Sequence, residues 1–195
     1  RGSSMPAPGT SAAPHAHSSE EIKKHVNIPV ATVARINEPW MAEELIANEK
    51  CDMCMIGRPN LCDSEFANKA FEGKVDDIRP CIGCGRCLTG IMMGKRISCT
   101  VNPSVEDDTI EKASDKKKVL VIGGGPAGME AAYVAKKRGH EVVLCEKSNE
   151  LGGQLRLAAV PIAKQELCKV IKFMIRRLDN EGIDVRLNTE VTKEM

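Results

Sequence analysis

The sequence predicts an α/β protein with parallel sheets, and three observations support this fold class. Short apolar runs alternate with amphipathic stretches over 28–71, which is the rhythm of a parallel sheet covered by helices. A segment dense in cysteine and glycine follows at 79–99. After a polar stretch at 104–117, an apolar run, a glycine-rich turn and an alanine-rich stretch predict a strand, a turn and a helix.

The composition excludes several classes of function. A net charge of +1 and an aromatic content of 3% argue against general binding to nucleic acid. No apolar run approaches the roughly 18 residues of a membrane span, and no signal segment opens the chain. Nine cysteines, four of them in metal-like spacing, favour a reducing cytoplasm. Because the chain begins at Arg1 and stops at Met195 just after an apparent strand, we expect a piece of a longer protein.

The first part of the chain predicts strands and helices in alternation. Residues 1–18 are rich in Pro, Ala and Ser and predict a loop, and a helix should begin with Ser18 or Ser19 as its N-cap. Apolar, partly β-branched runs predict buried strands at 28–34 and 51–56. Helices should follow both strands, which gives a parallel βαβα arrangement.

Capping residues set the expected starts of those two helices. Asn37 can cap the first, with Pro39 near its first position, and Asp63 or Ser64 can cap the second. The apolar positions of both helices, expected to face the core, are Met41, Leu45, Ile46, Phe66, Ala70 and Phe71.

Each of the two predicted strands ends in a basic residue. Arg35 follows Ala34, and Arg58 follows Gly57. In a barrel of parallel strands, the carboxyl ends of the strands form the active-site face and the last two often hold a phosphate. Two arginines could clamp a phosphate there, or each could pair with a local acid.

Four cysteines form the spacing Cys-x2-Cys-x2-Cys-x11-Cys: Cys81, Cys84, Cys87 and Cys99. All-thiolate ligation without histidine is typical of an iron–sulfur cluster. Structural zinc sites also use four cysteines, but usually as two Cys-x2-Cys pairs, and a disulfide framework does not suit a chain without a secretory signal. The pattern favours iron–sulfur, with zinc as the alternative.

Three further cysteines, Cys51, Cys54 and Cys62, are predicted to be core residues. A second cluster is conceivable from their spacing. However, a strand would point Cys51 and Cys54 to opposite faces, which is poor geometry for binding one metal. Free cysteine is also common in protein cores.

The glycine-rich turn Gly123-Gly124-Gly125-Pro126-Ala127-Gly128 has the context of a dinucleotide-binding site. Gly123 makes the turn, Gly125 lets the backbone approach a pyrophosphate, and Gly128 lets helix and strand pack closely. Glu146, 18 residues beyond Gly128, ends the second strand and is placed to hydrogen bond an adenosine ribose.

A second glycine pair lies downstream, in Gly152-Gly153-Gln154, and could also allow close approach to a cofactor. A helix is expected over 162–181, ended by Gly182 and followed by a strand at 183–187. Its apolar stripe, expected to be core, is Leu167, Val170, Ile171, Met174, Ile175 and Leu178.

Together these motifs resemble the multidomain flavin and iron–sulfur oxidoreductases related to old yellow enzyme. This family includes 2,4-dienoyl-CoA reductase, 2-enoate reductase and trimethylamine dehydrogenase. The resemblance covers nearly the whole chain and rests on motifs in a fixed order: Arg35-Ile36-Asn37, Gly57-Arg58-Pro59, Arg79-Pro80-Cys81-Ile82-Gly83-Cys84, Cys99-Thr100-Val101-Asn102-Pro103, the glycine-rich turn and Gly152-Gly153-Gln154.

The resemblance implies a division into four parts. Residues 1–79 would be the last two βα units of an FMN-binding (β/α)8 barrel, and 80–103 the iron–sulfur segment. Residues 104–117 would be a linker, and 118–195 an incomplete Rossmann-like domain for FAD. The substrate pocket, the proton donor and the nicotinamide-binding fold would lie outside this chain, so no catalytic residue is assigned and the chain alone should be inactive.

Cofactor roles follow from the same resemblance. Ala34, Arg35, Gly57 and Arg58 would hold the FMN phosphate, although many relatives have Gly where Ala34 stands. Cys81, Cys84, Cys87 and Cys99 would ligate a [4Fe-4S] cluster. The two glycine motifs and Glu146 would bind FAD, or ADP alone as in the amine-dehydrogenase branch. The Cys84-x2-Cys87 spacing is also that of the amine-dehydrogenase branch, where dienoyl reductases have x3.

The implied activity is reduction of activated C=C bonds with NAD(P)H, electrons passing from FAD through the cluster to FMN. The expected partner is a small-molecule substrate such as an enoate or enoyl-CoA, with no nucleic acid or membrane, and with pairing to the rest of the enzyme or to a second copy. Two alternatives stay open: an amine dehydrogenase and a non-catalytic electron-transfer module.

Overall fold

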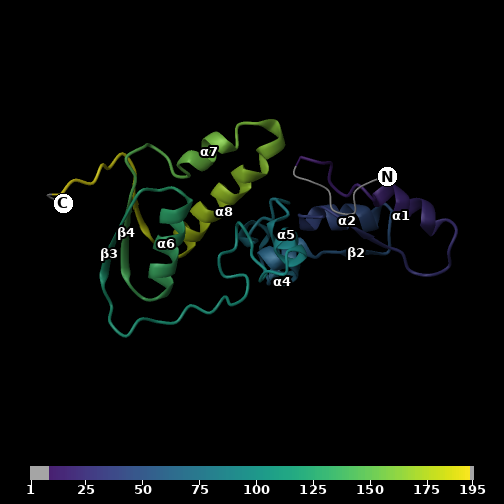
Figure 1. The fold of residues 1–195 in the computed structure, drawn as a ribbon, viewed down its shortest axis with the longest axis horizontal. Helices are drawn as coiled ribbons and strands as arrows, with labels where there is room; N and C mark the ends of the chain where they lie inside the picture. Colours follow the sequence, from purple (N-terminus) through teal and green to yellow (C-terminus); the bar gives the residue numbers. More distant parts are fainter. Residues whose placement is uncertain (1–8, 194–195) are drawn as a thin grey trace. The chain divides into compact units, whose positions relative to one another are not determined.

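The computed structural model describes residues 9–193, so the predicted loop at 1–18 lies partly outside the described residues. The chain divides after Asp107 into two compact units, and each is described by itself (Figure 1). The division falls within the polar stretch at 104–117, which carries no helix or strand.

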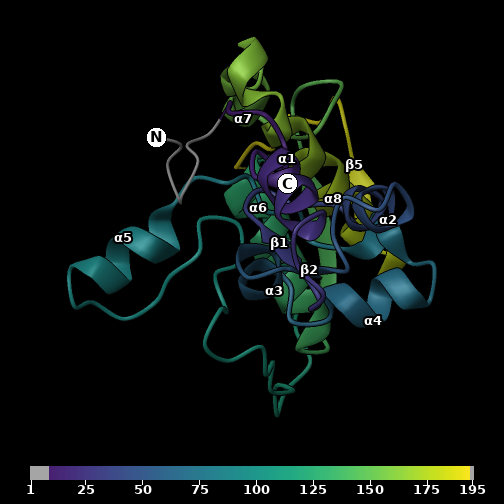
Figure 2. The same cartoon turned by 90° about the vertical axis from the view of Figure 1, so that its right-hand side faces the viewer.

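The first unit alternates short strands and helices, as predicted. The strands β1 (Ala31–Val33) and β2 (Met53–Met55) are parallel, with Ala31 opposite Met53 and Val33 opposite Met55. The prediction that both strands are buried is wrong, because Val33, Met53 and Met55 are exposed. Figure 2 gives the clearest view of α5, which follows the cysteine-rich loop. In chain order the elements are α1 (Ala16–Lys23), β1 (Ala31–Val33), α2 (Pro39–Ala47), β2 (Met53–Met55), α3 (Arg58–Cys62), α4 (Phe66–Phe71), the 3-10 turn η1 (Val75–Asp77) and α5 (Arg86–Met92).

The predicted start of α1 at Ser18 or Ser19 is wrong. The helix begins at Ala16, with His15 in the N-cap position and no side-chain cap. Ser19 is buried inside the helix, and its hydroxyl donates to the carbonyl oxygen of Ala16 over 2.8 Å. The hydroxyl is therefore used within the first turn rather than to start it.

The predicted cap of α2 is also wrong. Glu38 occupies the N-cap position, while Pro39 lies at the start of the helix as predicted. The Asn37 amide instead donates to the carbonyl oxygen of Cys81 over 3.2 Å. A tertiary contact to the cysteine loop thus replaces the local cap.

The predicted cap of α4 at Asp63 or Ser64 is wrong, because Glu65 occupies the N-cap position with no side-chain cap. Asp63 lies two residues before it. Its Oδ1 accepts from the N–H of Glu65 over 3.1 Å, and its Oδ2 accepts from Arg79 N and Lys69 Nζ, each over 2.7 Å.

Two of the positions predicted to face the core are exposed. Phe71 is 94% exposed, because α4 has barely two turns and buries Phe66 on one side. Ile46 is likewise exposed on α2, where Leu45 is the buried residue.

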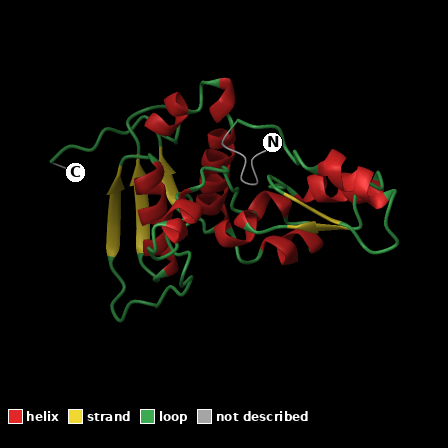
Figure 3. Ribbon diagram, turned by 45° about the vertical axis from the view of Figure 1, so that its right-hand side comes forward, coloured by secondary structure: helices red, strands yellow, loops and turns green. Residues whose placement is uncertain are grey.

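The second unit is a three-stranded parallel sheet in the order β3-β4-β5 (Figure 3). Lys118 pairs with Glu141 at one end of β3 and Ile122 with Cys145 at the other. Its elements are β3 (Lys118–Ile122), α6 (Pro126–Lys137), β4 (Glu141–Cys145), α7 (Gln154–Ala158), the 3-10 turn η2 (Ile162–Lys164), α8 (Glu166–Asn180) and β5 (Asp184–Arg186).

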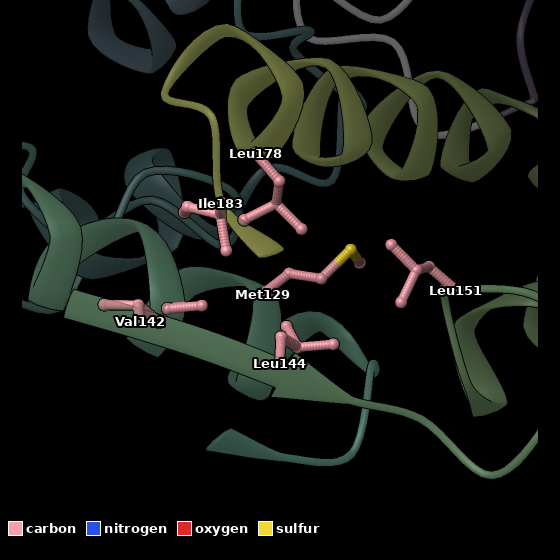
Figure 4. Close-up of a cluster of buried hydrophobic side chains, with 7 residues drawn as sticks. Met129, Val142, Leu144, Leu151, Leu178 and Ile183 are labelled. Atoms are coloured by element: carbon pink, nitrogen blue, oxygen red, sulfur yellow. The ribbon is translucent and has the colours of Figure 1, made fainter. Parts of the chain in front are cut away.

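The core of this unit lies between the sheet and the helices α6 and α8 (Figure 4). The stripe predicted for α8 is largely confirmed, since Val170, Ile171 and Leu178 are buried and Met174 and Ile175 pack against the core. The helix begins at Glu166 rather than 162, and Gly182, at φ +60°, follows its end. The buried cluster comprises Met129, Ala132, Val142, Leu144, Leu151, Leu178 and Ile183.

No helix in the described part of the chain is long and apolar enough to cross a membrane.

Candidate cofactor sites

The carboxyl ends of β1 and β2 open onto one pocket. Ala34, Arg35, Gly57 and Arg58 all line it, so the structure brings the four predicted phosphate residues together. Ala34 and Arg35 have φ angles of +85° and +49°, and residues other than glycine adopt this backbone conformation only at a cost in free energy. Ala34 therefore carries the backbone conformation that glycine adopts readily.

The two arginines of this pocket also reach the cysteine-rich loop. Arg58 Nη1 donates to the carbonyl oxygen of Gly83 over 3.5 Å. Arg35 is 6% exposed, and a Cβ added to Gly83 would lie 2.5 Å from its Nη1. Gly83 has φ +62°, a conformation that favours glycine, and a Cβ there would displace the Arg35 guanidinium.

The four predicted metal-binding cysteines line one cavity. Cys81, Cys84, Cys87 and Cys99 face it from the loop, from α5 and from the segment after α5. Arg58 lines this cavity as well as the phosphate pocket.

Hydrogen bonds around Cys99 favour its thiolate form. The pKa of Cys99 is lowered to about 6. The main cause is a hydrogen bond with the Cys62 thiol, and hydrogen bonds from the N–H groups of Asn102 and Val101 lower it further. Burial raises the pKa of Cys81, against the opposing pull of the Gly83 N–H and Arg58. Since the thiolate is the metal-binding form, Cys99 is prepared to act as a ligand.

The four cysteines supply an all-thiolate donor set around one cavity. Such a set, without histidine, is typical of an iron–sulfur cluster, so the chemistry of these residues fits the group. Within residues 9–193, no three His, Cys, Asp or Glu side chains lie closely enough together to hold one metal ion.

Cys62 is the site residue that the sequence analysis missed. It was predicted to be core, and it is fully buried, but it also lines the four-cysteine cavity. It is the last residue of α3, a helix that the sequence did not predict. Nothing in the spacing of Cys62 relative to Cys81 or Cys99 signals this placement.

The predicted geometry of Cys51 and Cys54 is wrong. Their Sγ atoms lie 3.8 Å apart rather than on opposite faces. The reason is that β2 begins only at Met53, so Cys51 precedes the strand and the period of two does not apply.

The glycine-rich turn joins β3 to α6 as predicted. Gly123, at φ +99°, follows β3, and Gly125 is the N-cap residue of α6. A Cβ on Gly128 would collide with the carbonyl oxygen of Gly123, whereas one on Gly125 would meet no atom within 4 Å. Gly128 is thus required by packing, and Gly125 leaves open space beside the helix N-terminus.

Glu146 is tied to this turn by its own hydrogen bonds. The N–H of Gly124 donates to its Oε2 over 2.6 Å, and the N–H and hydroxyl of Ser148 donate to its Oε1 over 2.9 and 2.8 Å. The Ser148 N–H, followed by the Gly124 N–H, lowers the pKa of the Glu146 carboxyl. The carboxylate therefore stands charged beside the turn.

The second glycine motif packs directly on the first. Gly152 donates its N–H to the carbonyl oxygen of Gly124 over 2.8 Å, and a Cβ on Gly153 would lie 3.2 Å from the Cα of Gly125. Gly152 has φ +112° and Gly153 φ +50°, and the exposed Gln154 begins α7. Two motifs distant in the sequence thus form one glycine-lined surface.

Two family models match the chain. Residues 5–77 match the NADH:flavin oxidoreductase / NADH oxidase family, and residues 118–189 match the FAD dependent oxidoreductase family. The first part of the chain is thus similar to the NADH:flavin oxidoreductase / NADH oxidase family, and the second to the FAD dependent oxidoreductase family. Among curated proteins of this kind, an NADH oxidase of Thermoanaerobacter brockii is 44% identical over 173 residues, which is 86% of this chain and 27% of that protein.

Other relatives extend the comparison. A cinnamate reductase of Clostridium sporogenes is 40% identical over 90% of this chain and 27% of its own length. A solved 2-naphthoyl-CoA reductase complex matches with a TM-score of 0.92 and 32% identity, over 99% of this chain and 30% of that one. Histamine dehydrogenase from Rhizobium sp. 4-9 matches with a TM-score of 0.89 and 26% identity, over 97% and 29%. The chain spans about a quarter of the curated relatives, 27% of the two named here.

Proposed function

We propose that this chain is part of an NAD(P)H-dependent flavin and iron–sulfur oxidoreductase that reduces activated C=C bonds, of the enoate or enoyl-CoA type. The observation that carries the proposal is the position of Arg58, which lines both the phosphate pocket and the four-cysteine cavity. One side chain thus adjoins two sites whose residue types suit a flavin phosphate and a one-electron carrier. The names of the cinnamate reductase and 2-naphthoyl-CoA reductase support this substrate class.

In this proposal the pocket at the ends of β1 and β2 binds the FMN phosphate. Arg35 and Arg58 supply charge and directed N–H donors, and both are held in place by the cysteine loop. The left-handed backbone at Ala34 and Arg35 shapes the turn that surrounds the phosphate.

The glycine-lined surface of the second unit, in turn, binds FAD or ADP. Gly125 leaves space for a pyrophosphate at the start of α6, whose N-terminal N–H groups favour anions. Glu146 presents a charged carboxylate to a ribose, and Gly152 and Gly153 extend the surface.

The role of Cys81, Cys84, Cys87 and Cys99 is to hold a [4Fe-4S] cluster. When bound, the flavins and the cluster supply hydride chemistry and single-electron transfer. The residues of this chain bind and orient these groups and exclude water from them. The proposed setting is a reducing cytoplasm, because four of the nine cysteines have metal-like spacing.

The test is an anaerobic assay of the full-length protein after its flavin and metal content has been measured. We expect FMN, FAD or ADP, iron and sulfide in the same protein, and oxidation of NADH or NADPH that depends on an added enoate or enoyl-CoA. A protein that holds these cofactors but reduces neither substrate class would contradict the proposed reaction.

A second candidate is an amine dehydrogenase that passes electrons outward. It is favoured by the Cys84-x2-Cys87 spacing and by relatives such as a dimethylamine dehydrogenase of Hyphomicrobium sp., 35% identical over 161 residues. In the same assay, bleaching of the flavin by secondary or tertiary amines, without reduction of enoates, would select this candidate.

A further inference from the structure

The carboxylate of Glu146 is held by donors on both of its oxygens. Oε2 accepts from the Gly124 N–H over 2.6 Å, which ties it to the first glycine motif. Oε1 accepts from the N–H and the hydroxyl of Ser148, over 2.9 and 2.8 Å. Each carboxylate oxygen can accept about two hydrogen bonds. The capacity of Oε1 is therefore used, whereas Oε2, with one donor among residues 9–193, keeps one position for a ligand.

The segment that carries Ser148 is attached to the backbone at the end of β5. The Glu146 N–H donates to the carbonyl oxygen of Arg186 over 2.9 Å, and the Thr189 N–H donates to the carbonyl oxygen of Glu146 over 2.9 Å. The Asn188 N–H donates to the carbonyl oxygen of Ser148, also over 2.9 Å. Because the backbone of both residues is held in this way, the two bonds from Ser148 can fix the orientation of the Glu146 side chain.

The Ser148 hydroxyl has two acceptors within reach but only one proton to donate. The second acceptor is the carbonyl oxygen of Glu150, 2.9 Å away, in the turn that leads to Gly152. A hydrogen bond to an ionised acceptor is roughly twice as strong as one between neutral groups. The hydroxyl proton therefore goes to the Glu146 carboxylate, and the Glu150 carbonyl is the acceptor that remains if the carboxylate is removed.

We propose that Ser148 is a positioning residue for nucleotide binding, which holds the Glu146 carboxylate in the orientation in which Oε2 accepts a hydrogen bond from a ribose hydroxyl. The inference deepens the proposed function and rests on it, since it requires a nucleotide at the glycine-lined surface. The ligand class is an adenosine diphosphate with free ribose hydroxyls, either ADP itself or the ADP half of FAD. The competing role of Ser148 is support of the turn through Glu150 alone.

The experiment uses the full-length protein, depleted of bound nucleotide, and three probes: ADP, 2′-deoxy-ADP and 3′-deoxy-ADP. Ser148→Ala removes the hydroxyl donor, and Ser148→Thr keeps one. Ser114→Ala is the matched control, because Ser114 is also an exposed serine of the second unit and precedes β3. Urea unfolding first establishes that each variant is folded, and calorimetric titration then gives the dissociation constant of each probe.

The wild type should bind ADP about 10-fold or more tightly than at least one deoxy analogue, because that analogue lacks a hydrogen bond to a charged group. Ser148→Ala should reduce this preference about 3- to 10-fold, whereas Ser148→Thr and Ser114→Ala should keep it. Equal weakening of all three probes in Ser148→Ala would overturn the positioning role in favour of general support of the turn. Equal affinity of the wild type for all three probes would overturn the ribose contact.

A double-variant cycle tests whether Ser148 acts through Glu146. Glu146→Ala removes the carboxylate, so Ser148→Ala added to it should change ADP binding no further. A loss of affinity from Ser148→Ala that persists in the Glu146→Ala background would overturn the inference, because it would arise through Glu150. A wild-type protein that binds no ADP would refute the proposed nucleotide site, which is a different failure from ADP binding that Ser148→Ala leaves unchanged.

Discussion

Arg58 donates a hydrogen bond to the carbonyl oxygen of Gly83, and Gly83 lies between Cys81 and Cys84. The residue proposed to bind the FMN phosphate therefore also supports the loop that carries two proposed cluster ligands. Arg35, two residues after the end of β1, approaches the same glycine. The two proposed cofactor sites of the first unit share these side chains, so a substitution in one site should also weaken cofactor binding at the other.

The first prediction follows from this sharing. Arg58→Ala should weaken FMN binding about 10- to 100-fold, since hydrogen bonds to charged groups contribute about 1.5–3 kcal/mol. It should also speed the loss of iron to a chelator. FMN titration and chelator kinetics on the full-length protein measure both effects. Arg96→Ala is the control, because the Arg96 side chain is 87% exposed and pairs with Glu106. Weaker FMN binding with unchanged iron loss would refute the coupling.

The second prediction separates two glycines of the same turn. Gly125→Ala should leave stability within about 0.5 kcal/mol, because φ is −73° and the new Cβ meets no atom. It should nonetheless abolish nucleotide binding, because the methyl group occupies the space offered to a pyrophosphate. Gly128→Ala should destabilise the protein by about 1–3 kcal/mol or more, because its Cβ collides with the Gly123 carbonyl oxygen.

Urea unfolding and FAD or ADP titration measure the two effects separately. If Gly125→Ala binds the nucleotide as tightly as the wild type, the proposed pyrophosphate position is wrong.

The third prediction concerns the ion pair that joins α6 to α8. Both terminal nitrogens of Arg177 donate to Glu130, over 3.0 and 3.2 Å, and the guanidinium lies 3.5 Å from the centre of the Tyr133 ring. Arg177→Met should cost about 3 kcal/mol, because it leaves a half-buried carboxylate unpaired. The double variant Arg177→Met/Glu130→Gln should recover part of that loss in urea unfolding. Additive effects would show that the pair is not coupled.

The fourth prediction is a dependence of stability on pH. Hydrogen bonds from Ser148 and Gly124 hold the pKa of Glu146 below its ordinary value of 4.5. A carboxyl group with a lowered folded pKa contributes stability that is complete above its unfolded pKa and is lost as the pH falls through the folded one. Unfolding free energy should therefore fall below about pH 4.5, and fall less steeply in Glu146→Gln. The same slope in Glu146→Gln and wild type, with exposed Glu141→Gln as the control, would contradict this assignment.

The sequence predicts features of the fold that depend on local pattern. The glycine turn after β3, the stripe of α8 and the parallel pairing of β1 with β2 follow from periodicity and glycine placement, and the structure has all three. Asn37 and Ser19 were mispredicted as caps because each makes a hydrogen bond that spacing does not indicate. Capping propensity was overridden by a tertiary contact for Asn37 and by a bond within the helix for Ser19.

The candidate sites are likewise predicted only in part. The sequence predicts the four cysteines from their spacing and the two arginines from their positions at strand ends. It does not predict that Cys62 lines the cavity with Cys99, because that position depends on α3 and on the contacts of Asp63 and Arg79. The proximity of Cys51 to Cys54 was missed because the predicted strand was longer than β2. Errors in element boundaries thus became errors in side-chain placement.

The central claim is that four cysteines of this chain hold an iron–sulfur cluster. The most direct measurement is the iron, sulfide and zinc content of the anaerobically purified full-length protein and of its Cys99→Ser variant. The account predicts about four irons and four sulfides per chain, with a large loss in Cys99→Ser. One zinc per chain without sulfide, or iron that is unchanged in Cys99→Ser, would contradict it.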